Sequence, residues 1–246
     1  IHDGHDVCQW LRLSPEIVRS FPQLLSLRDL QELLREAVNA EIIVRSNSAI
    51  ALAQSYSRVF VPTDSYYAAR DKLQQHAFVV LEGPPEMGKT TIGRVIALSQ
   101  IFSGWEALEC RNPAEVLKMY RADTRQVFVA DDFFGRTEYE PIRVSEWQAE
   151  LAHIIPLLDQ SHWLVLTCRA HLLEMAKSEL DISGQNHRFP SLGEVVVDAG
   201  KLKLGEKARI LYRHAKAFGL STAGKEIVRA HASLIVKHHH FTPERI

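Results

Sequence analysis

Apolar residues recur at two spacings along the chain, and the change between them divides it. Over residues 1–57, leucines and valines return every three or four positions with charges between them, as in LRDLQELLREAVNAEIIV. This spacing predicts amphipathic helices. From about residue 58, short continuous apolar runs alternate with helical patterns. Such runs are typical of buried parallel strands separated by helices.

The alternating region predicts an α/β fold. Thr63 or Asp64 can cap a helix that runs to about His76 and precedes the first strand. The predicted strands lie in AFVVLEG, WEALEC, QVFVADD, HWLVLTC and GEVVVDA. The helices between them are predicted over 89–102, 113–120, 144–158 and 170–180. Strict alternation of this kind favours a parallel five-stranded sheet between helices.

The strand patterns stop near residue 204. GEKARILYRHAKAFGL and GKEIVRAHASLIVKHHH then predict two helices of an appended lid. The expected parts are a helical segment over 1–57, an α/β domain over 58–203 and a helical lid subdomain over 204–246. Thr242, Pro243 and Glu244 form a helix-start signal, so we expect the chain to continue into a further domain.

Composition and charge limit the function classes. The chain holds 29 Lys and Arg against 30 Asp and Glu, so it lacks the basic excess typical of sequence-independent nucleic-acid binding. Cys8, Cys110 and Cys168 lie far apart without CxxC spacing, which argues against a disulfide framework or a zinc site. No apolar run approaches the roughly 20 residues of a membrane span. We therefore expect a cytoplasmic protein with neither a membrane nor a direct nucleic-acid partner.

The stretch GPPEMGKT, after the first predicted strand, matches G-x-x-x-x-G-K-[ST] at every fixed position. A strand before it and a helix after it direct backbone N–H groups at an anion. Gly83 and Gly88 allow the tight turn, Lys89 would reach the β- and γ-phosphates, and the Thr90 hydroxyl would help to hold Mg²⁺. The predicted nucleotide-binding residues of this loop are Gly83, Pro84, Pro85, Glu86, Met87, Gly88, Lys89, Thr90 and Thr91. The alternative is a plain turn with a solvated lysine.

Two further strand ends carry residues suited to the same chemistry. VFVADD ends in Asp131, predicted to hold the metal, and Asp132, predicted to orient or deprotonate the attacking water. HWLVLTCRAH contains Thr167, predicted to sense the γ-phosphate or the water, and Arg169, predicted to neutralise phosphate charge. We predict catalytic roles for Asp132, Thr167, Arg169 and Lys89. The alternatives are an Asp-Asp turn and an arginine that only starts the next helix.

Together these motifs resemble STAND NTPases, the signal-transduction ATPases with numerous domains, and in particular their bacterial novel STAND branch. The resemblance rests on FVPTDSYYAARDKLQQH, GPPEMGKT, VFVADDFFG, LVLTCRAHLL, GEKARILYRHA and HHHFTPERI, roughly residues 58–246. It implies the ASCE division of P-loop NTPases, in which one strand separates the strands that carry the loop and the acidic pair. It also implies ATP or ADP with Mg²⁺, and places Phe60, Val61 and Pro62 near the adenine.

The resemblance further implies a slowly hydrolysing switch that couples a trigger ligand to self-assembly and to an upstream effector. A winged-helix and sensor region would follow residue 246, and several branches of the family act in bacterial antiviral defence. ATP is favoured over GTP by the resemblance and by the lack of a guanine-reading N-K-x-D stretch. The family's glycine-x-proline element is missing from AGKLKLGEKA. The alternatives are an AAA+ motor ATPase and a non-catalytic scaffold that holds a nucleotide.

Overall fold

The computed structural model describes residues 14–21, 58–101, 103–135, 138–176 and 192–246, and these carry a parallel sheet with strand order β2-β3-β4-β1-β5. The strands are β1 Phe78–Glu82, β2 Glu106–Glu109, β3 Gln126–Ala130, β4 His162–Thr167 and β5 Val196–Asp198. Every neighbouring pair is parallel. Because β4 lies between β1 and β3, one strand separates β1, which leads into the predicted phosphate loop 83–90, from the acidic strand β3, which leads into Asp131 and Asp132. The predicted fold class is confirmed.

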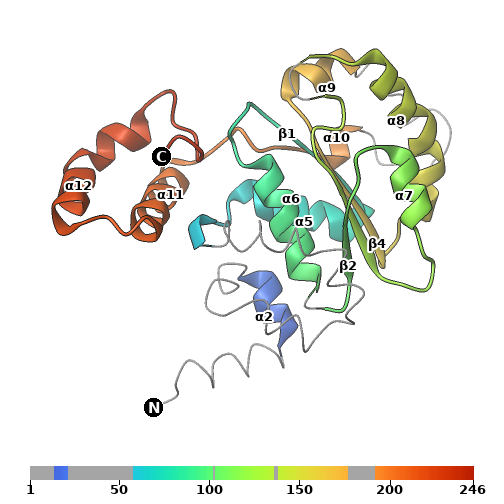
Figure 1. Ribbon diagram of the computed structural model, residues 1–246, viewed down its shortest axis with the longest axis horizontal. Coiled ribbons are helices and arrows are strands. Elements are labelled where there is room, and N and C mark those ends of the chain that lie inside the picture. Colours follow the sequence, from blue (N-terminus) through green and yellow to red (C-terminus); the bar gives the residue numbers. More distant parts are fainter. Residues whose placement is uncertain (1–13, 22–57, 102, 136–137, 177–191) are drawn as a thin grey trace.

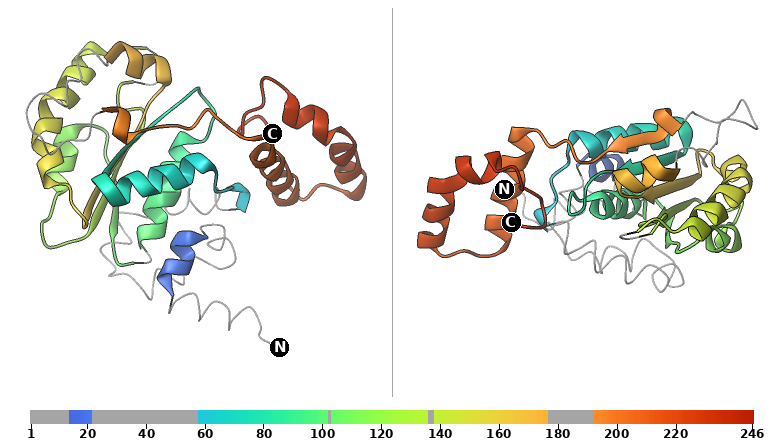
Figure 2. Two further views of the ribbon diagram at one scale, coloured as in Figure 1. Left: turned by 180° about the vertical axis from the view of Figure 1, so that it is seen from behind. Right: turned by 90° about the horizontal axis from the view of Figure 1, so that it is seen from above.

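Helices cover both faces of the sheet (Figure 1 and Figure 2). The helices are α2 Pro15–Ser20, α5 Asp64–His76, α6 Lys89–Ile101, α7 Pro113–Met119, α8 Pro141–Ile154, η2 Ile155–Leu157, α9 Ala170–Ala176, α10 Leu192–Val195, α11 Leu204–Ala217 and α12 Thr222–Lys237. Val79 and Leu81 of β1 pack in the cluster that contains α5 and α6. Phe78 and Val80 pack in the opposite cluster with α7, α8 and α9. This alternation within one strand buries the sheet on both faces.

Several element boundaries differ from those predicted. The run GEVVVDA begins in the short helix α10, and only its last part forms β5. α8 begins at Pro141, earlier than expected, because proline fits the first helical turn, and it ends before the 3₁₀ turn η2. The expected helix start at Thr242 is instead a turn closed by the Arg245 N–H on the Thr242 carbonyl at 3.2 Å. The predicted segment 1–57, apart from 14–21, and the end of the helix predicted over 170–180 lie outside the described residues.

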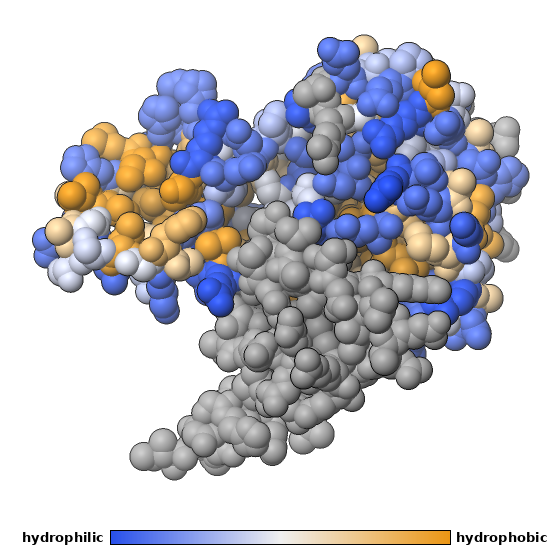
Figure 3. Space-filling model, in the orientation of Figure 1, coloured by the Kyte–Doolittle hydropathy of each residue, from blue (hydrophilic) through white to orange (hydrophobic). Residues whose placement is uncertain are grey.

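Residues 204–246, predicted to form a lid, contain the helices α11 and α12 and lie beside the sheet, joined to β5 by a short connection (Figure 1). We refer to them below as the lid. Val61, which precedes α5, packs with the lid residues Ile210, Leu211, Val236 and Phe241. The outer surface of the lid keeps large apolar side chains exposed (Figure 3), namely Leu204, Tyr212, Phe218, Ile227 and Leu234. Among the described helices, none has the length and hydropathy that crossing a membrane requires.

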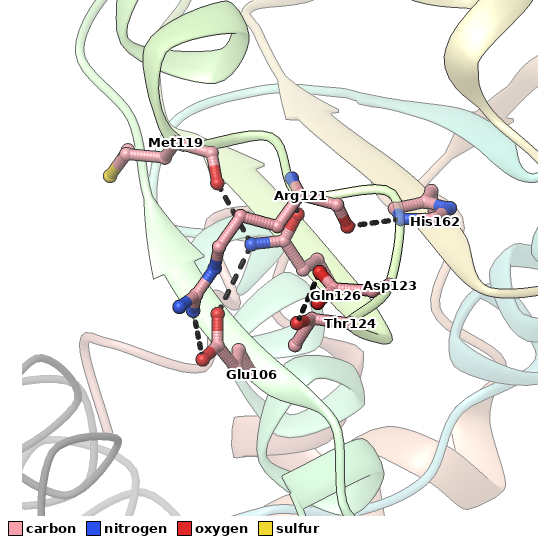
Figure 4. A network of polar contacts seen from close by, with 7 residues as sticks. All are labelled: Glu106, Met119, Arg121, Asp123, Thr124, Gln126 and His162. Atoms are coloured by element: carbon pink, nitrogen blue, oxygen red, sulfur yellow. Dashed lines mark hydrogen bonds and ion pairs between the residues drawn. The ribbon is translucent and has the colours of Figure 1, made fainter.

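A buried polar cluster fixes the amino ends of β2, β3 and β4 (Figure 4). The Gln126 amide donates to the Glu106 carboxylate at 3.1 Å and to the Met119 carbonyl at 2.9 Å, and it accepts from the Arg121 N–H at 2.8 Å. The Arg121 guanidinium pairs with Glu106, and the Arg121 carbonyl lies 3.0 Å from His162 Nε2. Since the strands are parallel, this cluster lies at the end of the sheet opposite the phosphate loop.

Candidate nucleotide site

The phosphate loop connects β1 to α6 through left-handed residues. Gly83, Glu86 and Gly88 have φ of +148°, +65° and +84°. Glycine takes such angles freely, whereas Glu86 stores about 1 kcal/mol of backbone strain. Left-handed residues within a turn are the arrangement in which successive N–H groups form an anion-binding concavity. The helix α6 begins directly after the loop, and the Ile92 N–H donates to the Gly88 carbonyl at 2.8 Å.

Lys89 folds back across this loop. Its ammonium donates to the Gly83 carbonyl at 3.0 Å and to the Pro84 carbonyl at 2.7 Å, and the residue is only 7% exposed. Burial lowers the pKa of Lys89 below its ordinary value, while the nearby Asp132 acts in the opposite direction. Carbonyl oxygens compensate a buried cation only in part, so an incoming phosphate would supply the missing negative charge. The lysine and the loop therefore fit a phosphate-bearing ligand.

The loop and the acidic strand meet at Asp131. Asp131 Oδ1 accepts from the Thr90 hydroxyl at 2.7 Å and from the Thr167 hydroxyl at 2.5 Å. A hydroxyl and a carboxylate brought together in this way are the oxygen donors that Mg²⁺ prefers. The side chains fit the predicted metal role of Thr90 and Asp131. The Thr167 hydroxyl donates to Asp131, and its predicted contact with the γ-phosphate or the attacking water stays a prediction.

Asp132 has an unusual backbone that Thr167 helps to hold. Its φ is +48°, and its N–H donates to the Thr167 hydroxyl at 3.0 Å. Asp and Asn tolerate this left-handed conformation better than most residues. The Thr167 hydroxyl therefore contacts both aspartates: it donates to the Asp131 carboxylate and accepts from the Asp132 backbone N–H.

Arg169 follows β4 at the same edge of the sheet. Its carbonyl accepts from the Leu172 and Leu173 N–H groups at 3.0 and 3.1 Å, so its backbone starts α9. Burial is the main cause of the lowered pKa of Lys89, and the positive charge of Arg169 acts in the same direction. The predicted helix-start and charge roles are therefore compatible. Between Thr167 and Arg169, burial raises the pKa of Cys168 to about 12, so this thiol stays protonated.

The phosphate loop packs against the turn that leaves β5, a contact that no sequence motif predicted. A Cβ atom on Gly83 would lie 3.0 Å from Gly200 N, and one on Gly200 would lie 2.8 Å from Pro84 Cδ. Asp198 shapes the turn, since its Oδ1 accepts from the Gly200 N–H at 2.7 Å. The two glycines thus allow the exit of β5 to touch the loop.

Gly200→Ala is expected to weaken nucleotide binding about tenfold, because the added methyl group would displace Pro84 and the loop; overpacking of this kind costs about 1–3 kcal/mol. Gly205→Ala is the matched control, since a Cβ there meets nothing within 4 Å. Nucleotide titration and thermal melting of both variants would test this. Equal affinity in the two variants would contradict a role for the close contact.

A cleft of about 920 Å³ lies on the β5 side of the loop. Its walls are the loop segment 84–87, residues of α5 between 64 and 72, β5 with the residues that follow it, Lys207 of α11 and the segment 239–245 after α12. Its charged lining residues are Lys72, Lys201, Lys203, Lys207 and Arg245 against Asp64, Glu86 and Asp198. Basic groups are therefore in excess along the cleft, and its volume suits a nucleotide-sized ligand.

The other predicted site residues differ in burial and in whether they line the cleft. Pro84 and Pro85 are exposed along the cleft, whereas Met87 is buried and Thr91 is half-buried at the start of α6. Phe60 is buried against the main core and stacks edge-to-face with Tyr66 at 5.4 Å. Pro62 is half-buried. The described residues that line the cleft do not include Phe60, Val61 or Pro62, so adenine contact by these three stays a prediction.

Residues 60–217 match the family described as "Novel STAND NTPase 3". A comparison with curated protein sequences gave no significant match.

Among solved structures, AMPPCP-bound DnaA from Aquifex aeolicus aligns with 76% of this chain at 15% identity and a TM-score of 0.47, covering 60% of DnaA. RuvB of Thermotoga maritima aligns with 85% of the chain at 18% identity and a TM-score of 0.41, covering 60% of RuvB. ORC2 of Aeropyrum pernix, in ADPNP–ADP complexes, aligns with 73% at 12% identity and a TM-score of 0.34, covering 54% of that protein. The chain thus spans about 60% or less of the length of these structures.

Proposed function

The chain belongs to the Novel STAND NTPase 3 family, a family of nucleotide-binding NTPases, and from this premise we propose that it is an ATP-dependent molecular switch. In this proposal the protein binds ATP with Mg²⁺, hydrolyses it slowly, and couples a trigger ligand to self-assembly and to an effector. The bacterial defence role, the upstream effector and the downstream sensor are inferred from the family resemblance.

The hydrogen bond between Thr90 and Asp131 is the observation that carries the proposal. At 2.7 Å it joins the phosphate loop to the acidic strand, although 41 residues separate the two side chains in sequence. Thr90 and Asp131 would hold Mg²⁺, which when bound neutralises charge on the phosphate oxygens. Lys89 would bind the phosphates, and Asp132 would orient or deprotonate water.

The position of the cleft supports a direction for the bound nucleotide. Asp131 and Asp132 follow β3 on one side of the loop, whereas the cleft is lined by β5 residues on the other. Phosphates that lie along the loop with their metal-binding end toward Asp131 would leave the nucleoside on the cleft side. The base would then lie near α5 and the lid, close to the segment that contains Phe60, Val61 and Pro62.

Two features favour a switch over a motor. The residue after the metal-binding position is Asp132, whereas motor-type AAA+ ATPases usually carry a glutamate there. The Thr242 hydroxyl of the lid also donates to Glu86 of the phosphate loop, and this contact supports coupling between nucleotide state and lid position. The exposed apolar side chains of the lid, including Tyr212, Phe218 and Leu234, support further contacts with other domains or copies (Figure 3).

Titration of ATP and GTP with and without Mg²⁺, followed by steady-state turnover, would test the proposal. We expect tighter binding of ATP, strengthened by Mg²⁺, and turnover well below about one per second, the lower end of typical enzyme rates. Turnover of many ATP per second by the full-length protein would favour the motor alternative. Retention of ADP without any turnover would favour the scaffold.

A further inference from the structure

The segment that follows α12 is anchored in the lid. Phe241 is 7% exposed and packs with Val61, Ile210 and Val236. The Lys207 ammonium lies 5.2 Å from the centre of the Phe241 ring, within the range of a cation–π contact. A turn then carries the chain from Thr242 to Arg245. The position of this segment is therefore fixed by the lid.

From that anchor, two side chains reach the phosphate loop and meet Glu86. Arg245 Nε lies 2.5 Å from Glu86 Oε2, and the Thr242 hydroxyl donates to the same oxygen at 3.2 Å. The hydrogen bond from Arg245 lowers the pKa of the Glu86 carboxyl, so Glu86 is anionic at neutral pH. Thr242 and Glu86 are 156 positions apart in the sequence. Glu86 is also the residue of the loop that holds a left-handed backbone without being glycine.

We propose that Arg245 is a positioning residue for the nucleotide site: through Glu86 it ties the phosphate loop to the lid and delays the release of bound nucleotide. The proposal rests on the proposed function, since it concerns the same site. Glu86, Thr242 and Arg245 all line the cleft, and their contact closes one of its walls between the loop and the lid segment. Movement of the lid away from the loop, which would open the cleft, requires this contact to break.

The exposure of the Glu86–Arg245 ion pair limits how much it can slow nucleotide release. The Glu86 and Arg245 side chains are 30% and 59% exposed, so water and salt screen the attraction. An exposed ion pair of this kind changes a rate by only a fewfold, and its effect shrinks at high ionic strength. A release rate that depends on salt through this pair is a signature that a merely structural contact would not produce.

The test measures how fast a fluorescent ADP leaves the protein when excess unlabelled ADP is added. Glu86→Gln keeps the shape of the side chain and removes its charge, and Arg245→Ala removes the partner. Each variant is expected to release ADP about two to five times faster than the unmodified chain. The double variant should be no faster than the faster single variant, because both changes break one contact. Arg245→Lys, which retains the charge, should restore part of the slow release.

Salt and a surface control complete the design. Raising the ionic strength from about 50 to about 500 mM screens the attraction between ADP and the basic residues in both proteins, but it should speed release from the unmodified chain by a larger factor than from Glu86→Gln. Arg229→Ala, which removes an exposed arginine of α12 that does not line the cleft, should release ADP at the unmodified rate.

The outcomes separate the two proposals. If the unmodified chain binds ADP, and Glu86→Gln and Arg245→Ala release it at the unmodified rate, the positioning role is overturned and the proposed function stands. Additive acceleration in the double variant would also overturn it, since the residues would then act independently. If the unmodified chain binds no nucleotide, both proposals are wrong.

Discussion

Replacing Lys89 with alanine is expected to lower the affinity for ATP and ADP by at least about 100-fold, equivalent to about 2.7 kcal/mol. The ammonium is buried and held by the carbonyls of Gly83 and Pro84 at the centre of the loop, where a phosphate would meet its full charge. Burial lowers the pKa of Lys89, which means that removing this cation from water makes the free energy of folding less favourable. The variant should therefore melt at a temperature equal to or above that of the unmodified chain.

Equilibrium titration with ATP and ADP, together with thermal melting, checks this expectation. Lys118→Ala removes an exposed lysine of α7 and should change neither quantity. Lys89→Arg keeps the charge but not the compact ammonium, so it should bind more weakly than the unmodified chain. A Lys89→Ala variant that folds and binds ATP with unchanged affinity would sink the nucleotide-site assignment.

Asp132→Asn is expected to reduce ATP hydrolysis by about 10²–10⁴-fold while ATP binding is largely retained, as for the loss of a general base. Asparagine has nearly the same shape and tolerates the φ of +48° that this position requires. The backbone hydrogen bond from residue 132 to the Thr167 hydroxyl should also survive. The change therefore removes the charge without disturbing the geometry.

Asp131→Asn is the informative companion, because Asp131 contacts Thr90 and Thr167. It should weaken the Mg²⁺ dependence of binding as well as hydrolysis, whereas Asp132→Asn should leave the Mg²⁺ dependence intact. Single-turnover hydrolysis measured at saturating ATP separates the two effects. Unchanged hydrolysis in Asp132→Asn would show that another group activates the water.

The architecture was predictable from sequence because buried parallel strands appear as short, continuous apolar runs. β1, β3 and β4 are short apolar runs followed by polar residues, and this pattern identifies both the strands and the sheet edge that carries the site. The boundary at β5 was not predictable in the same way. The run before Asp198 is rich in valine, but a short apolar run does not distinguish a strand from a helical turn, and α10 takes its first part.

Within the site, sequence motifs predicted the residues of the loop and the acidic strand, but they did not predict contacts between segments that are distant in the sequence. GPPEMGKT and VFVADD indicated Lys89, Thr90 and Asp131 because each role depends on nearby backbone. The hydrogen bond between Thr167 and Asp131 depends on the pairing and register of β3 and β4, which no local motif predicts. Gly200 and Arg245 carry no motif at all, because their roles arise only when the exit of β5 and the lid fold back onto the loop.

The buried Gln126 cluster at the amino ends of the strands has a consequence for how this domain can change over time. The Gln126 amide makes three hydrogen bonds within the cluster, and the parallel sheet separates the cluster from the phosphate loop by the length of the strands. Substitutions in this cluster are therefore expected to change the free energy of unfolding with little effect on nucleotide affinity. A lineage that adapts to a new temperature can vary the Gln126 end while it keeps the chemistry of the Lys89 end unaltered.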